Sequence, residues 1–280
     1  MRASAAALIS LLAAPLAAAA PPAATLVVCA PGSPGTTQEA QPAMDAFAKA
    51  LAARAGLPAG SLAATYAATE EAGVARLREK DASLALVSLP FFLRHAKALE
   101  LEPRLEPVLQ GGGPSERWSL VARKGAVAGP ASLDGTTILS TAGFAPEFVR
   151  GAALGAWGKL PPGVKVAQST AVLSGLRRAA AGEPVAVLLD GAQSAALATL
   201  PFAKDLEVVA RSPELPAGIL ATVAGREPAG RWAKLSRAFA ELPSDPAGAE
   251  ALAGIRMTRF VPLDEPALAA ARERAAKARR

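Results

Sequence analysis

The 280-residue chain has few of the side chains on which catalytic and metal sites are usually built. Cys29 is the one cysteine, so no disulfide can form within the chain, and its place in the apolar run 25–30 predicts a buried, inert thiol. His95 is the one histidine, too few for a usual zinc site, and the sequence has no G-x-S-x-G motif. We therefore expect no catalytic residue, no metal and no cofactor.

Aromatic residues are also scarce, at 4% against 51% hydrophobic residues, so the core is expected to be aliphatic and rich in alanine. The formal net charge is +6, but Arg2 supplies one of these charges and the last nine residues supply four more. The rest of the chain is nearly neutral and has no basic stripe with interleaved aromatic residues, so no nucleic acid is expected as a partner. The basic end, from Arg272, predicts a solvated helix face that frays into a tail.

Residues 1–20 predict a secretory signal peptide. Arg2 gives a positive start, an apolar stretch follows, and small residues precede Pro21. A membrane anchor is the weaker alternative, because alanine dominates the stretch and no later segment has the pattern of a membrane span. We expect cleavage near Ala20 and a soluble, exported chain in the periplasm.

Strand-like and helix-like segments alternate along the rest of the chain. In the first part, strands are predicted at 25–30, 63–66 and 83–89, with helices at 38–56 and 70–80. After a break at 111–114, strands are predicted at 118–124, 136–140, 164–168, 184–190 and 206–210, with helices at 144–157, 173–181 and 192–200. A strand at 218–225 and helices at 232–242, 246–254 and 266–277 look like a return to the first unit. This order predicts an α/β fold with a largely parallel sheet in each unit.

One turn carries much of the polar chemistry. In LSTAGFAPEF (139–148), Ser140 and Thr141 stand between a predicted strand end and a helix start. Their hydroxyls and the N–H groups of Ala142 and Gly143 can converge on an anion, because helix N-termini favour negative charge. A plain helix N-cap is the alternative, and for this turn taken by itself the cap is the stronger interpretation.

Several segments, in order, resemble the phosphonate-binding family of periplasmic solute-binding proteins, which serve ABC importers. They are VVCAPGSPG with the helix after it, ALVSLPFFL, WSLVARKGAVAGPASLDGTTIL, LSTAGFAPEF, PVAVLLDG and SPELPAGILATVAGREP. The resemblance covers nearly the whole chain after the signal peptide. It implies a two-lobed type II periplasmic-binding-protein fold, a Venus flytrap that closes on a small oxyanion.

The resemblance also implies how the chain divides. Lobe I is expected at 25–118, lobe II at 119–218, and a return to lobe I with the C-terminal helices at 219–280. Two hinge crossings, near 119–123 and 219–223, are expected to join the lobes.

With this resemblance, anion contact at the turn becomes the favoured interpretation, so Ser140, Thr141, Ala142 and Gly143 are expected to form the main anion cradle. Three further residues, Ser33, Ser88 and Asp190, are candidate ligand contacts, and each has a plain structural alternative. Ser33 belongs either to the ligand site or to an ordinary βα turn.

Ser88 ends a buried strand, where its hydroxyl is either a donor in the cleft or a satisfied core group. Asp190 binds an amine or hydroxyl of the ligand, or caps the helix that follows it. Arg117 either pairs with an anion or lies exposed. Family members often carry a tyrosine where this chain has Phe91 and Phe92, which predicts a less polar pocket.

We therefore expect a monomeric, non-enzymatic binding protein that captures a phosphonate- or phosphate-ester-like anion. It would deliver this ligand to an ABC permease or to a sensor protein. An interaction or sensory module with a degenerate pocket is the alternative, because phenylalanines replace the expected phenol. An exported hydrolase has less support, since the motifs for its nucleophile and metal are missing.

Overall fold

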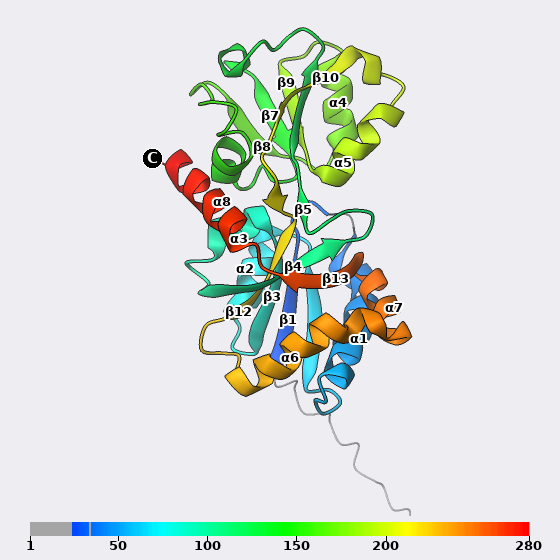
Figure 1. Cartoon of the computed structure of the whole chain (residues 1–280). Coiled ribbons are helices and arrows are strands. Elements are labelled where there is room, and N and C mark those ends of the chain that lie inside the picture. Colours follow the sequence, from blue (N-terminus) through cyan, green and yellow to red (C-terminus); the bar gives the residue numbers. More distant parts are fainter. Residues whose placement is uncertain (1–23, 34, 280) are drawn as a thin grey trace, which may run out of the picture.

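The computed structural model describes residues 24–33 and 35–279, which form two lobes, one above the other in Figure 1. The predicted signal peptide, residues 1–20, lies outside the described residues. Of the helices in the described part of the chain, none is both long enough and apolar enough to span a membrane.

Lobe I is built on a six-stranded sheet with the strand order β13-β4-β12-β3-β1-β2. Strand β1 (Ala24–Cys29) is buried along its whole length between two parallel neighbours, β2 (Leu62–Ala67) and β3 (Ala82–Ser88). The antiparallel half consists of β12 (Gly218–Val223), β4 (Leu101–Leu109) and β13 (Met257–Pro262). The chain therefore leaves lobe I after β4 and returns to it through β12 and β13.

Helices cover both faces of this sheet. On one face, α1 (Thr37–Arg54) packs with α6 (Ala229–Glu241) and α7 (Pro246–Gly254). Helix α1 begins at a capping box, in which Thr36 and Glu39 each bond the other's backbone N–H. On the other face lie α2 (Glu70–Arg78) and α3 (Leu89–His95). Alternate residues of β1 enter the two clusters, as the two-residue period of a strand requires.

Lobe II has a five-stranded sheet with the order β10-β6-β9-β7-β8. Its strands are β6 (Ser119–Arg123), β7 (Thr137–Ser140), β8 (Lys165–Gln168), β9 (Val185–Leu189) and β10 (Leu206–Arg211). Its helices are α4 (Val172–Ala180), α5 (Gly191–Ala196) and a π-helix at Phe148–Ala153, with short 3₁₀ turns between them. The π-helix stands where the sequence predicts a regular helix over 144–157.

A short antiparallel ribbon of β5 (Ser115–Glu116) and β11 (Leu215–Pro216) lies between the two large sheets. The chain passes between the lobes here. The segments expected as crossings, 119–123 and 219–223, belong to β6 and β12 instead, so both crossings precede them by a few residues. The reason is that β6 and β12 are apolar and each pairs with a neighbour on both sides, which places them inside the sheets.

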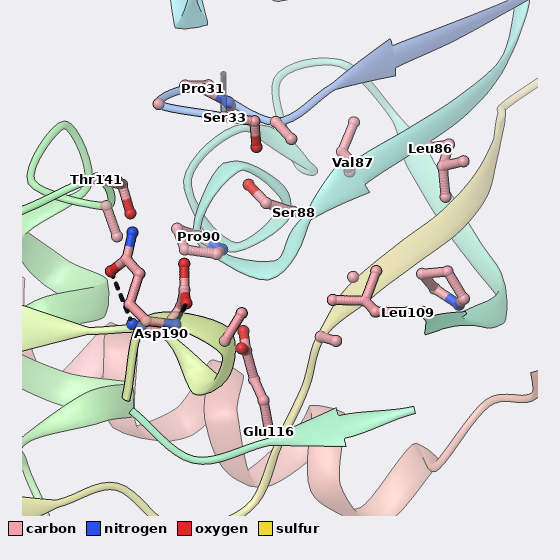
Figure 2. A pocket seen from close by; sticks show the side chains of 18 of the residues that line it. Pro31, Ser33, Leu86, Val87, Ser88, Pro90, Leu109, Glu116, Thr141 and Asp190 are labelled. Atoms are coloured by element: carbon pink, nitrogen blue, oxygen red, sulfur yellow. Dashed lines mark hydrogen bonds between the residues drawn. The ribbon is translucent and has the colours of Figure 1, made fainter. Parts of the chain in front are cut away.

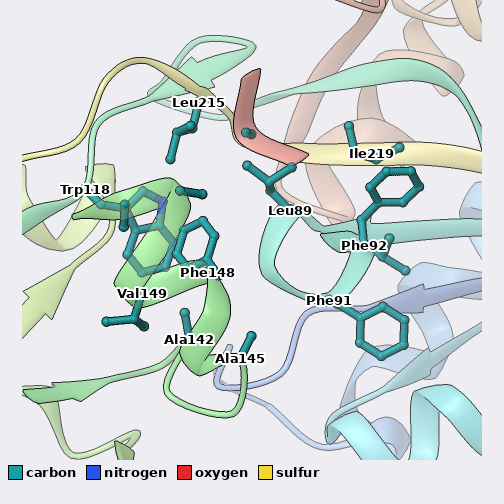
Figure 3. Packing of buried hydrophobic residues seen from close by; sticks show 14 of the residues in the cluster. Leu89, Phe91, Phe92, Trp118, Ala142, Ala145, Phe148, Val149, Leu215 and Ile219 are labelled. Atoms are coloured by element: carbon teal, nitrogen blue, oxygen red, sulfur yellow. The ribbon is translucent and has the colours of Figure 1, made fainter. Parts of the chain in front are cut away.

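One hydrophobic cluster continues from lobe I into lobe II (Figure 3). Lobe I contributes Phe91 and Phe92, both completely buried, and lobe II contributes Phe148 of the π-helix. Trp118, just after the ribbon, packs edge-on against Phe148 with 5.0 Å between the ring centroids. The lobes therefore share a core around the hinge.

Helix α8 (Glu265–Ala278) leaves lobe I after β13 and packs against the π-helix of lobe II (Figure 1). The two backbones approach closely, since a Cβ at Gly151 would lie 2.3 Å from the carbonyl oxygen of Arg274. Beyond the helix, Arg279 donates to the carbonyl of Leu93 in lobe I and to the carboxylate of Glu147 in lobe II. The basic C-terminal segment, expected to fray, is thus docked across both lobes.

Candidate functional site

A cavity of about 240 Å³ lies between the lobes, beside the hinge ribbon (Figure 2). Four of its polar residues lie at or after strand ends: Ser88 is the last residue of β3, Thr141 and Asp190 directly follow β7 and β9, and Ser33 lies in the turn after β1. The carboxyl ends of parallel strands are where open α/β sheets place their ligands. Both lobes therefore contribute to one site.

The hydroxyls of Ser33, Ser88 and Thr141 line this cavity. The Oγ of Ser88 is buried and has no hydrogen-bond partner among the described residues. A buried hydroxyl without a partner is uncommon and costs stability, so it is available to a bound molecule. In Figure 2, Ser33 and Ser88 stand on the lobe I side of the cavity and Thr141 on the lobe II side.

The expected anion cradle is only partly at the cavity. Thr141 and Ala142 line it, but Ser140 and Gly143 do not. Ser140 is fully buried, and its hydroxyl donates to the carbonyl of Leu188 on β9 (2.9 Å) and accepts the N–H of Ala142 (3.2 Å). The N–H of Gly143 donates to the Ser140 carbonyl (3.1 Å). These donors are used to shape the turn, which leaves the Thr141 hydroxyl as the group directed at the cavity.

The lobes touch at the rim of the cavity. Gly32 of lobe I has a φ of +87°, and a Cβ at this position would lie 2.8 Å from the Cβ of Thr141 in lobe II. A side chain there would be strained by the backbone angle and would also collide with Thr141. Glycine at position 32 therefore permits the closed approach of the two lobes.

Asp190 caps the helix that follows it, one of the two roles considered from the sequence, and its place on the cavity wall leaves ligand contact as a prediction. Its carboxylate accepts the N–H of Gln193 (2.8 Å), and the Gln193 side chain accepts the N–H of Asp190, which forms a capping box at the start of α5. Asp190 also lines the cavity, and burial raises the pKa of its carboxyl.

Glu116 is a second acid in the cavity, and it was not among the candidates from the sequence. It lies on β5, and its carboxylate accepts the N–H of Gly191 across the hinge (2.8 Å). Burial, and secondarily the nearby charge of Asp190, raise the pKa of Glu116 to about 7. No sequence motif marks Glu116, because the strand that holds it, β5, has only two residues.

The described residues that line the cavity include no arginine, lysine or histidine. Arg117 does not line it; its side chain lies 3.4 Å from Glu214 and is more than half exposed. Phe91 and Phe92, expected to make the pocket less polar, do not line it and belong to the interlobe core. Residues 24–33 and 35–279 contain no cluster of three or more His, Cys, Asp and Glu side chains that could hold a metal.

No protein-family model matches this chain, and no curated protein matches its sequence. Solved structures are similar to it along most of its length. XAC2383 from Xanthomonas citri, bound to chloride, has a TM-score of 0.69 and 15% identity, over 91% of this chain and 98% of the other. The binding component of an ABC phosphonate transporter from Pseudomonas aeruginosa has a TM-score of 0.62 and 14% identity, over 91% and 87%.

A third structure, PhnD1 from Prochlorococcus marinus in complex with methylphosphonate, has a TM-score of 0.59 and 15% identity, over 90% of this chain and 97% of the other. The chain has the two-lobed type II periplasmic-binding-protein fold. The fold class expected from the sequence is confirmed. In this type II fold the cavity at the hinge is the place where both lobes can contact one small molecule.

Proposed function

We propose that this protein is an exported solute-binding protein that encloses a small molecule between its lobes and delivers it to an ABC permease or a sensor. The observation that supports this most strongly is the cavity to which both lobes and the hinge contribute polar groups. Binding there bridges the lobes, so a ligand stabilises the closed arrangement relative to an open one. The fold, shared with binding proteins of several ligands, is consistent with this role.

The ligand class is inferred from two kinds of polar group on the cavity wall. The hydroxyls of Ser33, Ser88 and Thr141 can donate to an oxyanion such as a phosphonate. The carboxyls of Glu116 and Asp190 line the same cavity. Since no basic side chain among the described lining residues neutralises these acids, they favour a protonated amine. The proposed ligand is therefore a small oxyanion that also carries an amine.

We propose binding without catalysis. The Oγ of Ser88 has no partner among the described residues, so no base is in place to activate it as a nucleophile. His95, which could supply such a base, lies outside the cavity lining and is hydrogen-bonded to Glu70 (2.6 Å).

The test of the ligand class uses a matched pair, ethylphosphonate and 2-aminoethylphosphonate, in calorimetric titrations at pH 8. We expect the amine to improve affinity by about 10- to 100-fold, the range for charge-assisted hydrogen bonds. Asp190→Asn should reduce this preference while keeping the helix cap, because asparagine is also a good N-cap residue. The control Asp205→Asn removes an exposed aspartate of the same lobe. Equal affinities for the two ligands in the unaltered protein would refute the amine part of the proposal.

The oxyanion part of the proposal is tested by Ser88→Ala and Thr141→Ala. Each should weaken phosphonate binding by about tenfold or more, the effect of losing one hydrogen bond to a charged group. Ser88→Ala should not lower the melting temperature of the ligand-free protein, because this hydroxyl has no internal partner to lose. Normal binding by both variants would show that the hydroxyls do not contact the ligand.

Export is tested separately. N-terminal sequencing of the protein from a periplasmic fraction should give a chain that begins near Pro21. A protein that still begins at Met1 and sediments with membranes would contradict export, whatever the cavity binds.

A further inference from the structure

A second cavity, of about 390 Å³, lies where α8 crosses the π-helix of lobe II, and it shares no lining residue with the interlobe cavity. Four basic side chains line it: Arg150 and Lys159 from lobe II, and Arg274 and Lys277 from α8. None of its described lining residues is acidic. These positive side chains repel one another, and a bound anion would lower this repulsion.

The guanidinium groups of this cavity are held in place. Arg150 donates to the carbonyls of Pro161 and Val164, which fixes the plane of its side chain and leaves further N–H donors. Arg274 is positioned by the close contact of α8 with Gly151, and its Nε is buried without a hydrogen-bond partner among the described residues. A buried donor on a charged group without a partner is costly, so an acceptor that reaches this guanidinium would be stabilising.

The two lysines can complete such a site. Lys159 is exposed at the rim. Lys277 pairs with Glu273 at 2.7 Å, but both side chains are about two-thirds exposed or more, so this ion pair is worth little and can be exchanged. Compact ammonium groups add point charge to the planar donor arrays of the arginines.

We propose that this cavity binds a phosphate-type anion. Arginine forks match the geometry of phosphate oxygens, and the lysines supply the remaining charge. The phosphate can belong to a small phosphorylated molecule or to the headgroup of an anionic lipid, and the recognition chemistry is the same in both. Because α8 joins lobe I to lobe II here, an anion in this cavity also strengthens the contact between the lobes.

Pyrophosphate titrated calorimetrically at low ionic strength is the probe. The double variant Lys159→Gln/Lys277→Gln should bind it roughly tenfold more weakly. The control Lys165→Gln/Lys204→Gln removes two exposed lysines of lobe II that do not line the cavity. It should bind pyrophosphate as the unaltered protein does. Affinity should also fall as salt is added, because salt screens exposed charges.

The variant Ser88→Ala separates this site from the interlobe cavity. If pyrophosphate affinity depends on Ser88 and not on the two cavity lysines, the anion binds between the lobes and the proposal is overturned. Absence of pyrophosphate binding together with absence of binding to phosphatidylglycerol vesicles also overturns it.

The vesicles also distinguish the source of the phosphate. Co-sedimentation with phosphatidylglycerol vesicles, but not with phosphatidylcholine vesicles, that is lost in Lys159→Gln/Lys277→Gln supports a lipid headgroup at this site. Vesicle binding that the double variant retains contradicts the site. Circular dichroism of each variant confirms that a change in binding is not a change in folding.

Discussion

Glu116 is expected to make the stability of the free protein depend on pH. In the folded chain, burial raises the pKa of its carboxyl from 4.5 to about 7. A group with a raised folded-state pKa stabilises the protein fully below its unfolded pKa, and this contribution is lost as the pH rises through the folded pKa. The cost of ionising Glu116 therefore accumulates between about pH 4.5 and pH 7.

The magnitude follows from the size of the shift. One pKa unit corresponds to about 1.4 kcal/mol, so the shift of Glu116 is worth roughly 3 kcal/mol of unfolding free energy. Glu116→Gln removes the ionisation and can still accept the N–H of Gly191 through its amide oxygen. Relative to the unaltered protein, the variant should be about equally stable at pH 4 and roughly 3 kcal/mol more stable at pH 8.

Urea unfolding of both proteins at intervals from pH 4 to pH 8.5, without ligand, measures this difference directly. All other titrating groups are common to the two proteins, so the difference curve reports on Glu116. Glu250→Gln, an exposed position on α7, controls for the loss of one carboxylate far from the cavity. A difference curve that is flat across this pH range would refute the reasoning and place Glu116 in contact with water.

Three further changes test how the lobes are held together. Gly32→Ala should hinder closure, because its Cβ would meet Thr141; ligand should then no longer reduce the radius of gyration in solution scattering. Gly151→Ala should displace α8, because its Cβ would meet the backbone of Arg274; faster amide exchange in α8 measures this. Glu147→Gln should lower the unfolding free energy by about 1.5–3 kcal/mol, because the buried carboxylate bonds two arginines, and unchanged denaturation would contradict that role.

Much of the architecture could be predicted from local sequence. The strands β1, β3 and β9 are short apolar runs bounded by turn residues, which predict buried strands. The helices between them carry recognisable starts, such as Thr36 with Glu39. Because residues after such strands meet at one edge of a sheet, Ser33 could be expected near Ser88, and Thr141 near Asp190. That the two pairs face one cleft was implied by the family resemblance. The structure places all of them on one cavity.

The sequence by itself thus determined the alternation of elements and the strand ends at which the polar residues stand. Tertiary structure decided which groups face the cavity, because that depends on side-chain direction and on contacts between distant segments. Glu116 and Arg117 are neighbours in the chain, but only Glu116 lines the cavity, and Arg117 is largely exposed. Successive side chains of an extended backbone point to opposite sides, which accounts for the difference. The Ser140 hydroxyl donates to the Leu188 carbonyl of β9 and does not line the cavity. Helix α8 can pack closely against lobe II because residue 151, more than a hundred residues earlier in the chain, is glycine.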